Sequence, residues 1–182
     1  VLGAGRIHDF YLAKYAADGT LLWEQTAGTL NSSRTVQKDG QPGYKIALDA
    51  AGNIYVAGRS TGPAVFGNTT FPATPGGPLL CKFAPTGTLL WAKRAEGEGL
   101  VYNAVQLGGG EAHDLASDPD GNILISGQMF NGKADFGGTV VTMAGTYDSD
   151  SFMAKYNPAG EVLWVKTHRG GIGVVDRQGN IY

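Results

Sequence analysis

The chain has 182 residues, 16% of them charged, and a formal net charge of −2. This length suffices for one domain with a hydrophobic core. The lack of a basic excess argues against nucleic-acid binding, and no apolar run approaches the ~20 residues of a membrane-spanning helix. The single cysteine, Cys81, excludes an intrachain disulfide. We interpret Cys81 as a small buried residue rather than a reactive thiol.

The first element along the chain is a motif that occurs three times, at residues 11–23, 79–91 and 152–164. The three copies share the pattern Lys-x-x-x-x-Gly-x-x-x-Trp. Each copy consists of two short apolar runs around a few turn residues with a late glycine. This arrangement predicts a β-hairpin, whose strands we name C and D.

A second motif alternates with the first and occupies residues 46–58, 115–127 and 174–182. Its shared core is Asp-x-x-Gly-Asn-Ile, and it also predicts a hairpin, whose strands we name A and B. A further short hairpin is expected between strands B and C, at 64–71 and 134–141. No window shows a long apolar stripe of period 3.6, so we expect essentially no helix.

The alternation of the two hairpins predicts an all-β fold made of β-propeller blades with four antiparallel strands each. We expect one β-propeller segment over residues 1–182. It contains about two complete blades, at 43–95 and 112–167, and two half blades, the C–D strands at 8–26 and the A–B strands at 171–182. Closed propellers usually have about four to eight blades. We therefore expect a partial propeller whose partners include the remaining blades of the same propeller.

The combined pattern, Asp-x-x-Gly-Asn-Ile-Tyr-Val-x-Gly followed by Phe-Gly…Thr and by Phe-x-Ala-Lys-Tyr-x-x-x-Gly-x-x-x-Trp, resembles the bacterial SBBP-type β-propeller repeat family. The A–B hairpin alone is similar to NHL repeats. The Gly-x-Leu-Leu-Trp piece is similar to the tryptophan-docking repeat of quinoproteins. The SBBP resemblance implies a secreted or surface-displayed bacterial protein. That family has no single known activity, so the resemblance implies no catalytic residues.

Propeller topology places the short A–B and C–D turns at one end of the blades and the long B–C and D–A connections at the other. Binding sites tend to form on variable loops carried by a rigid scaffold. We therefore expect a binding face at the long-loop end, although solvated loop residues are the alternative for each position. The candidates are Arg34, Lys38, Tyr44, Arg59, Tyr102, Asn103, Gln106, Glu111 and His113.

Metal and cofactor signals are weak. The turn 118–122, Asp-Pro-Asp-Gly-Asn, resembles part of a calcium loop, but it lacks the full ligand register and the distal glutamate. We favour a tight hairpin turn there and expect no cofactor, with calcium binding as the alternative. Asp148 and Asp150 form a second acidic pair, which we interpret as a solvated loop, with divalent-ion binding as the alternative. The three histidines are scattered, and no spacing indicates a metal site or a catalytic motif.

The lysine and tryptophan of the C–D hairpin recur in every copy, so we expect both to serve the architecture. The aliphatic part of the lysine side chain should pack against its surroundings, while the ammonium group caps or pairs with a nearby polar group. The indole N–H of each tryptophan needs a partner.

The leading functional hypothesis is a non-enzymatic, extracellular module that binds protein or glycan through the long-loop face. One alternative is part of a propeller enzyme, such as a lyase, hydrolase or quinoprotein, whose active site other blades complete. A third is a purely structural spacer.

Overall fold

The computed structural model describes residues 10–29, 44–60, 63–72, 76–97, 101–102, 105–106, 109–130, 132–143, 149–168 and 175–182. Within these ranges every helix or strand assigned is a β-strand, which confirms the predicted all-β class. None of the described segments forms a helix long and apolar enough to cross a membrane.

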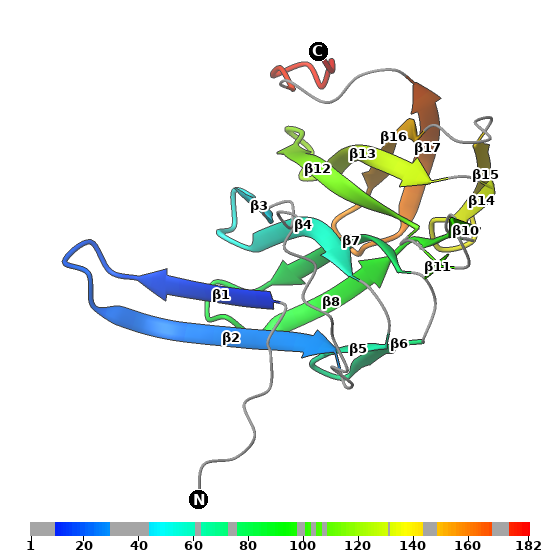
Figure 1. The fold of residues 1–182 in the computed structure, drawn as a ribbon. Coiled ribbons are helices and arrows are strands. Elements are labelled where there is room, and N and C mark those ends of the chain that lie inside the picture. The colour runs from blue at the N-terminus through cyan, green and yellow to red at the C-terminus, as the bar shows by residue number, and fades with distance from the viewer. Residues whose placement is uncertain are drawn as a thin grey trace, which may run out of the picture.

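Two four-stranded antiparallel sheets form the centre of the molecule (Figure 1). The first blade has the order β3 (Lys45–Leu48), β4 (Ile54–Ser60), β7 (Gly77–Phe83) and β8 (Leu89–Arg94). The second has the order β12 (Gly110–Ser117), β13 (Ile123–Phe130), β16 (Ser149–Tyr156) and β17 (Val162–His168). These orders are the predicted A–B–C–D arrangement of a propeller blade.

Half units flank the two blades. β1 (Phe10–Tyr15) and β2 (Leu21–Thr29) form the first C–D hairpin. Near the other end of the chain, Val175 and Ile181 form an isolated antiparallel bridge around the third Asp-x-x-Gly-Asn turn. The partial-propeller arrangement predicted from the motif order is therefore present.

The extra hairpin between strands B and C is also present in both blades. It consists of β5 (Ala64–Phe66) with β6 (Thr69–Phe71), and of β14 (Gly132–Asp135) with β15 (Val140–Met143). β5 pairs with the end of β2, and β14 pairs with β9 (Glu96–Gly97), which follows β8. Each extra hairpin therefore pairs with the end of strand D of the preceding unit, or with the short strand that follows it. These backbone hydrogen bonds join neighbouring units.

The hydrophobic core consists of two layers, one at each junction between units. In the first layer, Phe10 and Leu12 of β1 pack with Val56 and Phe83 of the first blade. The rings of Phe10 and Phe83 are stacked, with their centroids 5.8 Å apart. In the second, side chains of the two blades meet, with Tyr55, Ala57 and Leu80 against Ile123, Ile125, Phe152 and Tyr156. Strand C is apolar on both faces because each face contacts a different neighbour.

A small side chain occupies the middle of each strand C. Cys81 is fully buried in the first core layer, and Ala13 and Ala154 occupy the same place in the other copies. Burial raises the pKa of the Cys81 thiol well above its ordinary value, so the thiol stays protonated. Its position supports the interpretation of Cys81 as a packing residue.

Cys81→Leu should lower the free energy of unfolding by about 1–3 kcal/mol, because extra methylene groups overfill a packed layer. Cys81→Ala should cost less than about 1 kcal/mol, since alanine is the residue of the other two copies. Urea unfolding of the two variants measures the difference. Equal costs would contradict close packing at this position.

Candidate functional site

The aspartate of each A–B turn organises its turn through the same hydrogen bonds. Asp49 Oδ1 accepts from the backbone N–H of Ala51 at 3.0 Å and of Asn53 at 2.9 Å, and its Oδ2 accepts from Asn53 Nδ2 at 2.8 Å. Asp118 and Asp176 make the corresponding bonds in their own turns. The backbone angle φ of 77° at Gly52 explains the glycine of the motif.

The lysine of strand C connects this turn to the next unit. Lys155 Nζ lies 2.7 Å from Asp118 Oδ2, and Lys82 Nζ lies 3.8 Å from Asp49 Oδ2. Lys82 Nζ also donates to the backbone carbonyl of Pro158, in the following C–D turn, at 3.1 Å. The lysine therefore pairs locally, as expected, and in addition reaches the neighbouring unit.

The tryptophan of strand D reaches the same carbonyl. Trp91 Nε1 donates to Pro158 O at 3.3 Å, and Trp23 Nε1 donates to Pro85 O at 3.2 Å. Lys14 Nζ also donates to Pro85 O, at 3.4 Å. We call this arrangement the inter-blade latch: a lysine and a tryptophan of one unit donating to one carbonyl in the C–D turn of the next.

The glycine of the C–D turn accommodates the indole ring. A Cβ atom added at Gly160 would lie 3.0 Å from ring atoms of Trp91, and one at Gly87 would lie 2.7 Å from a ring atom of Trp23. The invariant Lys, Gly and Trp of the motif thus belong to one contact between units. The sequence did not identify the acceptor, because a backbone carbonyl has no residue signature of its own.

The electrostatics of the turn favour the ionised aspartate. Burial alone would raise the pKa of Asp118, but hydrogen bonds from Lys155 and from Asn122 outweigh it, so the pKa lies below its ordinary value. The same balance lowers the pKa of Asp49, where Asn53 supplies the main hydrogen bonds. The carboxylates at this end of the blades are therefore engaged in holding the fold. In particular, Asp118 accepts hydrogen bonds within the tight turn that we favoured over a calcium loop.

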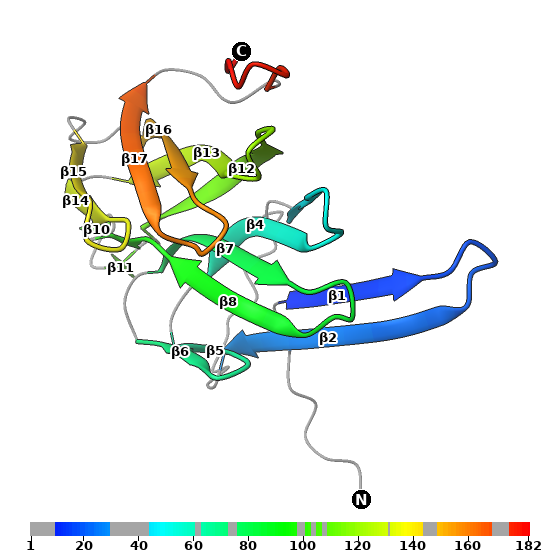
Figure 2. The same cartoon turned by 180° about the vertical axis from the view of Figure 1, so that it is seen from behind.

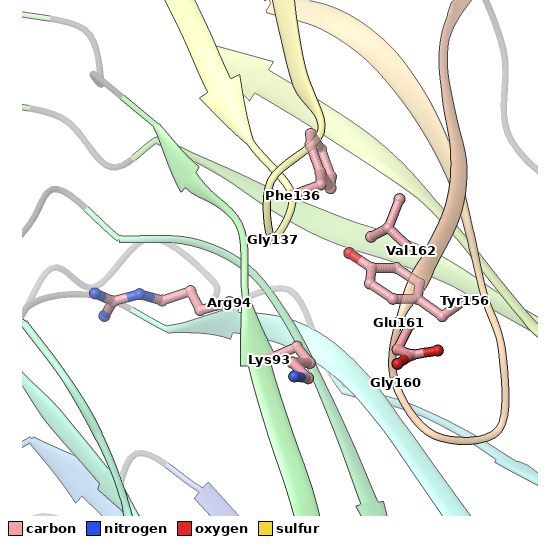
Figure 3. Close-up of a pocket in the computed structure, with 8 residues that line it drawn as sticks. All are labelled: Lys93, Arg94, Phe136, Gly137, Tyr156, Gly160, Glu161 and Val162. Carbon is pink, nitrogen blue, oxygen red and sulfur yellow. The ribbon is translucent and has the colours of Figure 1, made fainter.

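A pocket of about 280 Å³ lies between the outer strand β8 and the second blade (Figure 3). Lys93, Glu161 and the ring of Tyr156 border it, whereas the Arg94 side chain extends away from it. Arg94 instead binds Glu96 at 3.0 Å and the carbonyl of Pro72 at 2.9 Å. The volume is below the ~300–1,000 Å³ of typical ligand pockets. We therefore regard this pocket as a weaker candidate than the long-loop end.

Four of the predicted binding residues lie at the opposite end of the sheets and are described with their side chains: Tyr44, Arg59, Glu111 and His113. The Tyr44 hydroxyl donates to the carbonyl of Arg59 at 3.3 Å. His113 Nε2 and Glu111 Oε1 lie 2.7 Å apart. The structure thus brings these candidates together as two pairs, one on each blade.

Two local features shape these pairs. The Tyr44 ring covers Gly58, where an added Cβ would lie 2.3 Å from the ring. The β12–β13 register shifts between Ala112 and Asp114, so His113 occupies a β-bulge. Arg59 Nε is buried, and none of the described groups accepts a hydrogen bond from it.

The other predicted positions are less informative. Tyr102 lies in β10 (Val101–Tyr102) and Gln106 in β11 (Val105–Gln106), a separate two-stranded sheet whose side chains are not described. Arg34, Lys38, Asn103 and Asp148 lie outside the described residues. Asp150 lies in β16, where it pairs with Met129, and not in the loop that we expected; its side chain is likewise not described. Over the described ranges, no group of three His, Cys, Asp or Glu side chains could hold a metal ion.

Four-stranded antiparallel blades linked by a repeated latch define a β-propeller-type repeat protein. Residues 43–67, which include β3, β4 and β5, match the family model of the SBBP β-propeller repeat. This match confirms the SBBP-type resemblance, whereas the likenesses to NHL and quinoprotein repeats stay predictions. A search of curated proteins found no match to the chain.

Trp91→Phe should lower the free energy of unfolding by about 1 kcal/mol, because it removes the hydrogen bond to Pro158 while keeping an aromatic ring. Trp164→Phe is the matched control, since no described group accepts a hydrogen bond from Trp164 Nε1. It should cost less. Urea unfolding in dilute solution compares the two, and equal losses would contradict the latch.

The stability contributed by Asp118 should depend on pH. Its pKa is depressed in the folded state, so its contribution is present above the unfolded-state pKa of about 3.9 and disappears as pH falls through the folded-state value. Asp118→Asn should therefore destabilise the protein at pH 7 and lose less stability than the wild type between pH 5 and pH 2. Urea unfolding across this range tests the prediction, with Asp120→Asn in the same turn as the control. Parallel pH profiles for wild type and Asp118→Asn would contradict it.

Proposed function

We propose that this β-propeller segment is a non-catalytic scaffold that binds a protein or glycan through the face formed by its B–C and D–A connections. We further propose that it is secreted or displayed on a bacterial cell surface, an assignment that the SBBP resemblance supports. The observation that carries the binding proposal is a contrast between the two ends of strands A and B.

At the turn end, the two blades are chemically alike. Asp49 and Asp118 accept the same set of hydrogen bonds, and each lies beside the lysine of its own strand C. A site for one particular partner would not be copied in every unit. The groups at this end are also engaged with one another, which leaves few of them for a ligand.

At the opposite end of the same strands, the two blades differ. Tyr44 in the first blade corresponds to His113 in the second, and Arg59 corresponds to Gln128. The tyrosine closes over a glycine of its own sheet, whereas His113 is partly exposed beside the carboxylate of Glu111. The end with divergent chemistry is where a partner would meet a distinct surface.

The Glu111–His113 pair has the chemistry to recognise polar ligands. A carboxylate accepts hydrogen bonds, and an imidazole donates or accepts them according to its tautomer. Sugar hydroxyl groups and peptide amides both offer the complementary groups. Because the pair sits on β12 of a four-stranded sheet rather than in an isolated loop, the scaffold holds it in a defined geometry.

The proposal is tested by binding of the chain to an immobilised glycan array and to a peptide array. A Glu111→Gln/His113→Asn variant should lose about tenfold or more of the wild-type signal, because it removes the charge and the imidazole together. Asp18→Asn, an exposed change in a C–D turn, is the control and should bind as the wild type does. Equal thermal unfolding would show that the scaffold is intact.

Two results would contradict this function. One is the absence of wild-type binding on both arrays. The other is binding that survives the Glu111→Gln/His113→Asn substitutions but is lost in the turn-end control.

A further inference from the structure

The pocket beside β8 lies between the two complete blades. Figure 2 shows the turn of the β16–β17 hairpin next to β8. The pocket walls come from β8, from this hairpin and from the turn at 136–137 between β14 and β15. The junction between the β1–β2 hairpin and the first blade offers an internal comparison. There the repeat places Phe66, Gly67 and Leu89 where the pocket has Phe136, Gly137 and Val162.

Leucine fills this space at the first junction, whereas valine leaves it open at the second. A Cβ atom added at Gly67 would lie 2.9 Å from Leu89 Cδ2. A Cβ atom added at Gly137 would meet nothing within 4 Å, and the counterpart of Leu89 there is the shorter Val162. The repeat can therefore join two units without a cavity at this place.

The wall of the pocket includes one hydroxyl group without a protein partner. Tyr156 is only 3% exposed, and no described group forms a hydrogen bond with its hydroxyl. Figure 3 shows this hydroxyl directed toward the space between β8 and the turn at 136–137. Burial raises the pKa of Tyr156 above its ordinary value, so the hydroxyl stays protonated and can donate as well as accept. Buried polar groups are normally hydrogen-bonded, so the partner must come from the pocket.

Two charged side chains approach the pocket from opposite walls. Lys93 extends from β8, and no described carboxylate lies within ion-pair distance of it. Glu161 Oε2 accepts a hydrogen bond from Asn157 Nδ2 at 2.7 Å, which leaves Oε1 for another donor. Both charged residues are exposed, so an ion pair with a ligand would contribute little. Their charges are opposite, so the pocket favours an ion of neither sign. The counterparts at the first junction are the uncharged Gln25 and Thr88.

The chemistry of the pocket therefore favours a small neutral molecule with hydroxyl groups. Its other walls are apolar, and apolar walls with a few placed polar groups are typical of small-molecule sites. A monosaccharide has hydroxyl groups that match the three polar side chains and C–H groups that match the apolar wall. The volume of about 280 Å³ equals that of about nine waters at ~30 Å³ each, which suits one sugar ring rather than a chain of rings.

We propose that this pocket binds a monosaccharide. One sugar hydroxyl pairs with the Tyr156 hydroxyl, and the C–H face of the ring packs on Phe136 and Val162. Lys93 and Glu161 bind further hydroxyl groups at the rim. The lining residues all belong to the two complete blades. The site is separate from the long-loop face and does not rest on the function proposed for that face.

Proton–nitrogen correlation NMR of the 182-residue chain tests the proposal by titration with glucose, galactose, mannose and N-acetylglucosamine. At least one of these sugars should shift the backbone amide signals of residues 137 and 160–162, with a dissociation constant in the millimolar range or tighter. The amide signals of residues 111–113, at the long-loop end, should stay in place. Glycine is the comparison ligand, because it is a zwitterion without hydroxyl groups, and it should cause no shift.

Two variants that carry the residues of the first junction locate the ligand. Tyr156→Phe removes only the hydroxyl group and should raise the dissociation constant about tenfold or more. Val162→Leu should fill the space, as Leu89 does, and abolish the shifts. Tyr15→Phe makes the same chemical change at an exposed tyrosine outside the pocket. It is the matched control and should leave the dissociation constant within about twofold.

The spectra also report whether each variant is folded, because a folded chain keeps the dispersed signals of the wild type. Three results would overturn the proposal. The first is the absence of shifts with all four sugars. The second is an equal or stronger effect of glycine at the same amides. The third is sugar binding that is unchanged in folded Tyr156→Phe or in folded Val162→Leu.

Discussion

The structure depends on one backbone carbonyl at each junction between units. Pro158 accepts hydrogen bonds from both Lys82 and Trp91 of the preceding blade, and Pro85 does the same for Lys14 and Trp23. A carbonyl oxygen has two lone pairs, so the two donors share it without competing. Lys82 also lies beside Asp49 of its own blade. The latch at Pro158 therefore links an A–B turn, a C–D hairpin and the next unit.

This constraint separates the two ends of the blades in function. The turn end must keep its aspartate, lysine, glycine and tryptophan in each complete unit, because every blade needs the same contact with its neighbour. The opposite end has no such requirement, and there Tyr44 in the first blade corresponds to His113 in the second. A scaffold of this kind keeps its architecture while its binding chemistry changes, which is the basis of the function we propose.

Sequence reasoning predicted the strands and their order well because the hairpins recur. Alternating apolar residues around Asp-x-x-Gly-Asn identified each turn, and two-sided apolar strands such as 79–83 indicated sheets buried on both faces. It did not predict the acceptor at Pro158, nor the pairing of β14 with β9, because backbone groups are the same in every residue. His113 contacts Glu111 from a β-bulge, and neither residue type predicts a bulge.

A double-mutant cycle on Lys82 and Trp91 tests most directly whether the two donors share one carbonyl. Lys82→Met and Trp91→Phe are made singly and together, and urea unfolding gives the free energy of each variant. Pro158 is exposed, so water replaces a lost donor, but two donors to one oxygen are energetically coupled. The loss in the double variant should therefore differ from the sum of the single variants by at least about 0.5 kcal/mol. Additivity within about 0.3 kcal/mol would contradict a shared latch.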